Sequence, residues 1–235
     1  MEAVKKRFSK QADHYAELST LQQKIAKALI DRLGSRPSRI LDLGAGCGAV
    51  FNVIDWPIER FVAVDFAPRM CELHPKNENI EIIEADFNNT KSLARLCDFG
   101  PYELLISSSA LQWSADLDLT MRALAKLGDR VAFAFFTDGT FGQLHRYTRL
   151  PSFLPNAQNA AEVIARYFQV KTEIVNFELQ FQTRRELFSY IRQSGVGGGV
   201  PRLKIEDARR LLREYPSLTL EFEVLYAVST PKAPL

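Results

Sequence analysis

The chain has 235 residues, of which 46% are hydrophobic and 25% are charged, and its formal net charge at pH 7 is +2. This composition excludes a disordered chain and a disulfide-stabilised miniprotein, and no apolar run approaches the roughly 20 residues of a membrane-spanning helix. Since the first residues lack a signal peptide and the three cysteines lack metal-ligand spacing, we expect one large, reduced, cytoplasmic domain without membrane contact.

The first predicted element is a helical region over residues 1–33. Apolar residues recur there at helical spacing in two groups, Phe8, Ala12 and Tyr15, then Leu21, Ile25, Ala28 and Leu29. Pro37 ends this region. We therefore expect residues 1–36 to form a helical cover over the domain.

Short apolar runs follow, and five of them are nearly continuous, as expected for strands buried on both faces of a parallel sheet. The segments between them are long enough for crossover helices. In the last run Leu220, Phe222 and Val224 alternate with glutamates, which indicates an antiparallel strand with one exposed face. The sequence thus predicts an α/β fold with about five parallel and two antiparallel strands. The predicted strands are 39–43, 60–65, 80–84, 102–107, 130–136, 172–181 and 219–230.

The strongest chemical signal follows the first strand, where the chain reads Asp42-Leu-Gly44-Ala45-Gly46-Cys-Gly48. Glycines let a strand turn sharply into a helix and let backbone N–H groups approach a ligand closely. The same residues also fit the dinucleotide-binding pattern G-x-G-x-x-G/A. The glycine turn alone therefore leaves open an adenosyl ligand, a dinucleotide, and a turn without a ligand.

Acidic residues at successive strand ends narrow this choice. Asp65 ends the second strand and can accept hydrogen bonds from both ribose hydroxyls of an adenosine. Asp86 follows the third strand and can accept from the adenine amino group, with Phe87 flanking the ring. Residues 42–118 carry 13 acidic and 5 basic side chains, and with Asp42 they suit a sulfonium or ammonium cation better than a pyrophosphate. Helix capping is the simpler alternative for either Asp65 or Asp86.

This constellation resembles the cofactor signature of class I S-adenosylmethionine-dependent methyltransferases, over roughly residues 37–230. The resemblance implies a Rossmann-like fold with a seven-stranded, mostly parallel sheet whose last strand is reversed. It implies S-adenosyl-L-methionine as the cofactor, with no metal. The glycine turn would lie by the methionine part. The candidate cofactor-binding residues are Asp42, Gly44, Ala45, Gly46, Gly48, Asp65, Phe66, Asp86, Phe87, Ser107 and Ser108.

Further segments resemble the malonyl-acyl-carrier-protein O-methyltransferases of biotin synthesis. They are, in the same order, Phe8-Ser-Lys-Gln-Ala-Asp-His-Tyr15, Ser107-Ser-Ser-Ala-Leu-Gln-Trp113, Gly139-Thr-Phe-Gly-Gln-Leu-His145 and Ile191-Arg-Gln-Ser-Gly-Val-Gly197. The sequence departs from that family at Ser108, where Asn is common. The resemblance implies methylation of the free carboxylate of a malonyl thioester on an acyl carrier protein or coenzyme A, the first step of pimeloyl synthesis.

Such a transfer needs few catalytic groups. A malonyl carboxylate has a pKa of roughly 4 and is ionised at pH 7, so no general base is expected. The protein has to orient the carboxylate and exclude water. The candidates for orienting it are Tyr15, His145 and Arg192. Their simpler interpretations are a packed aromatic, a surface histidine and a solvated arginine, and Trp113 can line the pocket or pack in the core.

A basic segment separates the last two strands, since residues 182–213 carry eight basic and three acidic side chains. It can attract an acidic acyl carrier protein and hold the phosphate of its prosthetic arm, although a solvated helix face is the simpler alternative. Nucleic acid is not expected, because aromatic and basic residues do not interleave. Within one domain, 1–235, we expect residues 182–215 to form an inserted helical cap.

Four functions remain open from the sequence. The first is the carboxyl O-methyltransferase, and the second is a methyltransferase of the same fold that acts on another small carboxylate or hydroxyl. The third is a nicotinamide-dependent oxidoreductase, which Asp86 and the reversed last strand disfavour. The fourth is a protein that binds the cofactor without catalysis.

Overall fold

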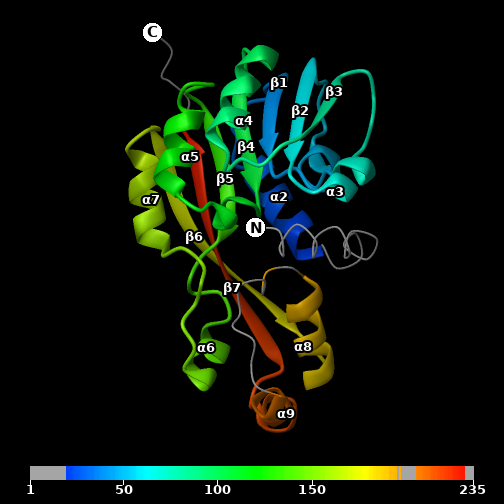
Figure 1. The fold of residues 1–235 in the computed structure, drawn as a ribbon, viewed down its shortest axis with the longest axis vertical. Coiled ribbons are helices and arrows are strands. Elements are labelled where there is room, and N and C mark those ends of the chain that lie inside the picture. Colours follow the sequence, from blue (N-terminus) through cyan, green and yellow to red (C-terminus); the bar gives the residue numbers. More distant parts are fainter. Residues whose placement is uncertain (1–19, 195, 197–204, 231–235) are drawn as a thin grey trace.

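The computed structural model spans the chain, and the structure describes residues 20–194, 196 and 205–230. Seven strands form one sheet: β1 (Arg39–Leu43), β2 (Arg60–Asp65), β3 (Ile80–Glu84), β4 (Leu104–Ser108), β5 (Val131–Phe136), β6 (Val170–Gln180) and β7 (Thr219–Ser229). Their order is β3-β2-β1-β4-β5-β7-β6 (Figure 1). Strands β1 to β5 run parallel, whereas β7 runs antiparallel to β5 and to β6. The predicted fold class is confirmed.

The strand boundaries lie within two residues of the predicted ones. The largest shift at a parallel strand is at β4, which begins after Tyr102 and Glu103. The Tyr102 hydroxyl donates to Leu96 O, and the Glu103 carboxylate accepts from the backbone N–H groups of Ser38 and Arg39. These hydrogen bonds hold the segment before β4 against Leu96 and against the residues at the start of β1.

Helices connect the strands, and most of them are short. Helix α2 lies within the predicted N-terminal helical region, whose residues 1–19, including Tyr15, lie outside the described part of the chain. The helices are α2 (Thr20–Ile30), α3 (Pro68–Leu73), α4 (Thr90–Arg95), α5 (Leu117–Leu124), α6 (Gly142–Thr148), α7 (Ala157–Ala165), α8 (Arg184–Gln193) and α9 (Ile205–Glu214), with 3₁₀ turns η1 (Phe51–Val53), η2 (Leu96–Phe99) and η3 (Leu111–Trp113).

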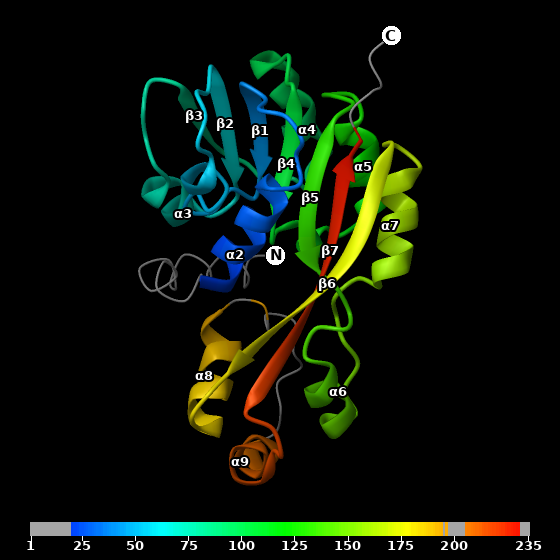
Figure 2. The ribbon, with the colours of Figure 1, turned by 180° about the vertical axis from the view of Figure 1, so that it is seen from behind.

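The sheet is covered on both faces, as its continuous apolar strands predicted. Because successive strand residues point to opposite faces, Ile40 packs in the core beneath α2, while Leu41 packs in the core with α4, α5 and α7. Figure 2 shows α2 on one face and these three helices behind the other. Helix α2 buries the predicted apolar stripe of Leu21, Ile25 and Leu29.

Strands β6 and β7 extend beyond the rest of the sheet. The pairing of β5 with β7 ends at Phe136 and Val224, whereas β6 and β7 continue to pair as far as Gln180 and Thr219. The extension carries α6, α8 and α9, and we call this part the projecting lobe (Figures 1 and 2). The carboxyl ends of the parallel strands point toward the junction between the sheet and this lobe, so ligands bound there lie between the two.

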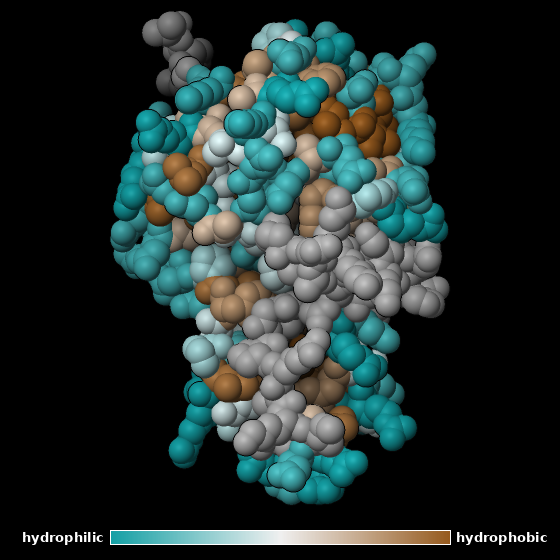
Figure 3. Space-filling view, in the orientation of Figure 1, coloured by the Kyte–Doolittle hydropathy of each residue, from teal (hydrophilic) through white to brown (hydrophobic). Residues whose placement is uncertain are grey.

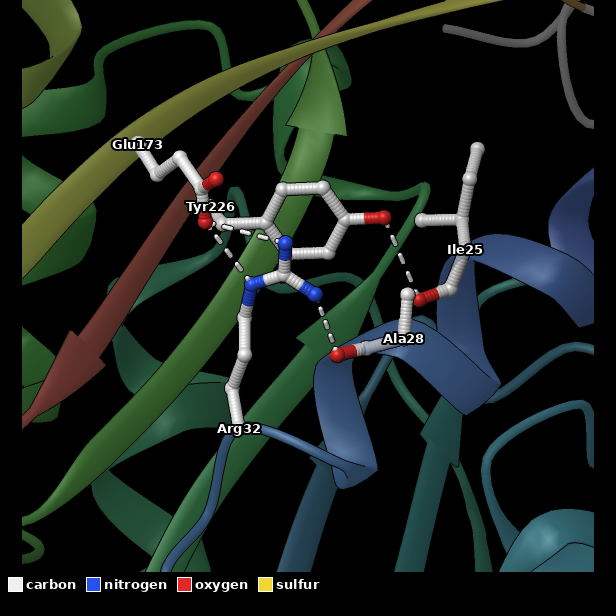
Figure 4. Close-up of polar contacts among 5 residues, drawn as sticks. All are labelled: Ile25, Ala28, Arg32, Glu173 and Tyr226. Atoms are coloured by element: carbon white, nitrogen blue, oxygen red, sulfur yellow. Dashed lines mark hydrogen bonds and ion pairs between the residues drawn. The ribbon is translucent and has the colours of Figure 1, made fainter.

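An arginine fastens the C-terminal end of α2 to the sheet (Figure 4). The Arg32 guanidinium lies 4.3 Å from the centre of the Tyr226 ring and donates to Glu173 and to Ala28 O. The Tyr226 hydroxyl contacts Ile25 O at 3.5 Å. Since Tyr226 and Glu173 belong to β7 and β6, the contacts hold α2 over the sheet.

The face of the molecule in Figure 3 is mostly hydrophilic, with separate hydrophobic patches rather than one continuous apolar band. Within the described residues, no helix has both the length and the apolar character that a membrane span needs.

Candidate active site

The glycine turn follows β1 and is shaped by left-handed backbone. Gly44, Gly46 and Gly48 have φ values of +70°, +56° and +89°. Gly44 N and Ala45 N both donate to Val64 O of β2, at 2.8 and 3.0 Å. A Cβ on Gly44 would lie 2.2 Å from the Cβ of Ala110, whereas one on Gly46 would meet nothing within 4 Å. A side chain at Gly44 would therefore clash with Ala110, whereas Gly46 borders open space.

Asp65 joins the end of β2 to the glycine turn. Its Oδ2 accepts from Gly46 N at 3.0 Å, and its Oδ1 accepts from Ala67 N at 2.8 Å. Burial raises the pKa of this carboxyl, and the backbone hydrogen bonds oppose that shift. A carboxylate offers about four acceptor sites, so these two bonds leave capacity for ligand hydroxyls.

Asp86 follows β3 and forms a local turn. Its Oδ1 accepts from the backbone N–H and the side-chain amide of Asn88, at 2.9 and 3.1 Å. The Asn88 amide also donates to Trp113 O and accepts from Ala115 N. The structure thus connects the end of β3 to the segment after β4, and Phe87 beside Asp86 is buried.

Asp42 lies beneath the glycine turn and is fully buried. Neither carboxylate oxygen has a hydrogen-bond partner. Burial, reinforced by the neighbouring Asp65 charge, raises the pKa of Asp42 well above its ordinary value. A buried acceptor of this kind is costly unless a proton or a nearby cation compensates it.

These elements enclose one pocket at the carboxyl ends of β1 to β4. Its described lining includes the carboxylates of Asp65 and Asp86 and contains no lysine, arginine or histidine. The full lining is Gln22, Gly44, Ala45, Gly46, Cys47, Ala49, Asp65, Phe66, Met70, Asp86, Phe87, Asn88, Ser108, Ser109, Ala110 and Trp113. The pocket is therefore rich in acceptors and suits a ligand that is cationic and donates hydrogen bonds.

Eight of the eleven candidate cofactor-binding residues line this pocket, and three do not. Asp42 lies below the turn. A Cβ on Gly48 would lie 2.6 Å from Pro75, so this glycine packs against the loop after α3 rather than facing the cavity. Ser107 is fully buried and donates to Leu43 O, which links β4 to β1.

Two of the predicted orienting residues, His145 and Arg192, do not belong to the described lining of the pocket. His145 lies on α6, with its Nδ1 3.0 Å from Leu150 O. Arg192 is exposed near the end of α8. Both therefore belong to the projecting lobe, and Tyr15 lies outside the described residues. The extension of β6 and β7 carries these two helices, and neither helix contributes a residue to the described lining of the pocket.

Sequence reasoning missed several lining residues. Gln22 of α2 is 3% exposed, and nothing in the apolar helical stripe signals its role. Ser109 adopts a positive φ of 59°, and Gln112 Nε2 donates to its carbonyl at 2.7 Å. Trp113, for which the sequence left pocket lining and core packing open, lines the pocket and also stacks on Phe153, with ring centres 5.6 Å apart. The Ser-Ala-Leu-Gln-Trp segment thus shapes the wall after β4.

Comparisons with known proteins agree with this geometry. No protein-family model matches the chain. The chain is 28% identical to a malonyl-[acyl-carrier protein] O-methyltransferase of Acetivibrio thermocellus, over 90% of the chain and 84% of that protein. It is 25% identical to the biotin biosynthesis bifunctional protein BioCD of Bordetella avium, over 91% of the chain and 48% of that protein. Among solved structures, Haemonchus contortus phosphoethanolamine N-methyltransferase 2 in complex with S-adenosyl-L-methionine matches with a TM-score of 0.57 and 14% identity, over 95% of the chain and 57% of that chain.

The sheet order, the pocket at the strand ends and the solved structure give the chain the fold of the class I methyltransferases. Its sequence is similar to the malonyl-[acyl-carrier protein] O-methyltransferases over most of its length. The expected methyl-transferring enzyme is thereby confirmed.

Proposed function

We propose that the protein transfers a methyl group from S-adenosyl-L-methionine to the free carboxylate of a malonyl thioester. The observation that carries the proposal is the acceptor-rich pocket beside the glycine turn, together with the similarity to malonyl-[acyl-carrier protein] O-methyltransferases. The alternative is a methyltransferase for another small carboxylate or hydroxyl.

The residues of the pocket fit an adenosyl sulfonium. Asp65 has acceptor capacity for the ribose hydroxyls, and Asp86 with Phe87 suits the adenine. The unpartnered Asp42 carboxylate beneath the turn favours positive charge above it. A nicotinamide dinucleotide fits worse, because its pyrophosphate would face two carboxylates and no cationic side chain of the described lining.

When bound, S-adenosyl-L-methionine supplies an electrophilic methyl group on a positively charged sulfur. The protein needs no general base for a malonyl carboxylate, which is already ionised at pH 7. Its residues have to exclude water and align one carboxylate oxygen. Charge is neutralised as the methyl moves, so strong ion pairing to the acceptor would favour the ground state over the transition state. Tyr15, His145 and Arg192 remain our candidates for orienting the acceptor.

We further propose that the malonyl group arrives on an acidic acyl carrier protein and that the ester serves pimeloyl synthesis for biotin. The names of the relatives support this substrate and pathway. A groove at the start of α8 supports the partner, because it combines Arg184 and Arg185 with the exposed apolar residues Leu212 and Leu218. No acidic side chain belongs to the groove's described lining.

The groove lies at the far end of α8 from the pocket. Arg184 is anchored there, since its Nε donates to Tyr215 O. Helix α8 has ten residues, so it spans about 15 Å from the groove toward the junction with the sheet. A carrier protein docked at the groove would therefore present its prosthetic arm along α8. The single domain of 1–235, with residues 182–215 as an inserted cap, is part of this proposal.

Two binding and transfer experiments test the function. S-adenosylhomocysteine should raise the melting temperature, whereas NAD should not, because ligands stabilise only the state that binds them. Labelled S-adenosyl-L-methionine with malonyl carrier protein or malonyl coenzyme A should yield a base-labile labelled ester. Stabilisation by NAD alone would refute the cofactor, and the absence of a labelled ester with either thioester would refute the carboxyl substrate.

The docking of the carrier protein is tested by charge reversal in the lobe. The double variant Arg185→Glu and Arg209→Glu should raise KM for the malonyl carrier protein and leave KM for malonyl coenzyme A nearly unchanged, with the difference shrinking at high salt. The matched control is Arg95→Glu with Lys126→Glu, which makes the same charge change at exposed positions near the opposite end of the molecule. Equal effects on both thioesters would overturn the docking site.

A further inference from the structure

Helix α2 contributes a buried amide to the pocket. Gln22 lines the pocket and is 3% exposed, yet its Oε1 has no hydrogen-bond partner. An amide oxygen buried without a partner destabilises the fold by about 1–3 kcal/mol. Its neighbour Gln23 is exposed, so the two glutamines of α2 have opposite environments. The buried position of Gln22 is therefore compensated only when something in the pocket donates to it.

The position of Gln22 is set by the packing of its helix. Leu21, Ile25 and Leu29 of the same helix lie in the core, and the Arg32 contacts hold its C-terminal end against β6 and β7. The amide is thus presented by a fixed element rather than by a free loop. A fixed donor or acceptor loses little entropy when a ligand binds.

The segment after β4 also contributes unpartnered polar groups to the pocket lining. Ser109 follows β4, and its Oγ and that of Ser108 are buried without partners. Ser109 holds a positive φ of 59°, which is uncommon for a residue other than glycine. The hydrogen bonds from Ser109 N to Ala134 O and from Gln112 Nε2 to Ser109 O, both 2.7 Å, maintain it. Such maintained strain occurs often at ligand sites.

The order of the strands assigns these polar groups to one end of the ligand. Asp86 follows β3, Asp65 ends β2, the glycine turn follows β1, and Ser109 follows β4, which is also their order across the sheet. An adenosyl ligand with its base at Asp86 and its ribose at Asp65 has its other end between Ser109 and Gln22. That end of S-adenosyl-L-methionine is an α-amino acid, with ammonium donors and carboxylate acceptors.

We propose that Gln22 and Ser109 bind the amino-acid end of the cofactor, Gln22 Oε1 accepting from its ammonium group and the Ser109 hydroxyl donating to its carboxylate. The assignment rests on the proposed function, because it presumes an adenosyl cofactor. Neutral groups suit this task, since the amino-acid end carries both charges and the described lining has no cationic side chain to pair with the carboxylate.

The test compares two ligands that differ only at that end. S-adenosylhomocysteine carries the amino acid, whereas 5′-methylthioadenosine keeps the adenosine and the sulfur and lacks it. Isothermal titration calorimetry should show that Gln22→Leu raises the Kd of S-adenosylhomocysteine about tenfold or more, because one hydrogen bond to a charged group is lost. Binding of 5′-methylthioadenosine should stay within twofold. Ser109→Ala should behave in the same way.

Gln23→Leu is the matched control and should change neither affinity. Gln22→Met, with an unbranched side chain of similar length, gives a second test if Gln22→Leu does not fold. The assignment would be overturned if the Gln22 and Ser109 variants lost affinity equally for both ligands, or lost affinity for neither. Failure of the wild-type protein to bind S-adenosylhomocysteine would refute the proposed cofactor itself, so the two failures are distinguishable.

Discussion

Gly46→Ala separates the two demands on the glycine turn, backbone conformation and room for a ligand. Gly46 has a φ of +56°, and a Cβ there would meet no heavy atom within 4 Å. The substitution therefore introduces left-handed strain without a clash, at a cost of about 1–2 kcal/mol. For a domain of this size, we expect the melting temperature to fall by about 2–8 °C.

The effect on binding should be larger than this small loss of stability suggests. Gly46 lines the pocket, so the new methyl group would occupy space that a ligand against the turn requires. Overpacking by one methyl group costs about 1–3 kcal/mol, which corresponds to roughly a five- to 150-fold higher Kd. Calorimetric titration with S-adenosylhomocysteine, alongside thermal denaturation, measures both quantities.

Two other glycines serve as controls. Gly34 has a φ of +55° on the exposed surface after α2, so Gly34→Ala introduces comparable strain and should leave the Kd unchanged. Gly44→Ala adds a 2.2 Å contact with the Cβ of Ala110 and should be the least stable of the three. If Gly46→Ala bound S-adenosylhomocysteine as tightly as the wild type, the ligand would not rest against the turn, and the proposed site would be wrong.

Two further predictions concern stability. Burial raises the pKa of Asp42 above its ordinary value near 3.8, so the folded protein retains a proton that the unfolded chain releases. The free energy of unfolding should therefore fall as the pH rises from about 3.8 through the raised pKa. Asp42→Asn should therefore raise the melting temperature at pH 8 by more than at pH 4, and it should weaken the binding of S-adenosylhomocysteine. A rise in melting temperature that is independent of pH would contradict the burial argument. Arg32→Met removes the Tyr226 and Glu173 contacts and should lower the melting temperature by about 2–8 °C, equivalent to about 1–2 kcal/mol. Glu173→Gln alone should cost less, since that carboxylate is more than half exposed, and an equal loss would show that the ring contact contributes nothing.

The parallel part of the sheet was predictable because its signals are local. A strand buried on both faces reads as a nearly continuous apolar run, and the core contains Leu41, Val62 and Leu105 as those runs required. The glycine turn was equally local, since left-handed backbone and close approach restrict the residue type at Gly44. These features depend on a residue and its immediate neighbours, so single-sequence reasoning finds them.

The division between residues that line the pocket and residues that support it was not predictable. Asp42 and Asp65 are both aspartates at strand ends, yet one lies beneath the turn and the other beside the cavity. Gln22 and Gln23 are adjacent in sequence, and only the orientation of α2 buries the first. Ser109 entered the sequence analysis only as part of the segment 107–113, and neither its positive φ nor the hydrogen bond from Gln112 to its carbonyl was predictable.

By itself, then, the sequence determined the strands, the order of parallel and antiparallel segments, the glycine turn and the acidic strand ends. Tertiary structure alone decided which polar groups meet in the pocket, and it placed His145 and Arg192 in the projecting lobe. The reason is physical: apolar periodicity and backbone restrictions act between near neighbours, whereas the pocket assembles from strands and a helix whose relative positions follow from packing across the whole sheet.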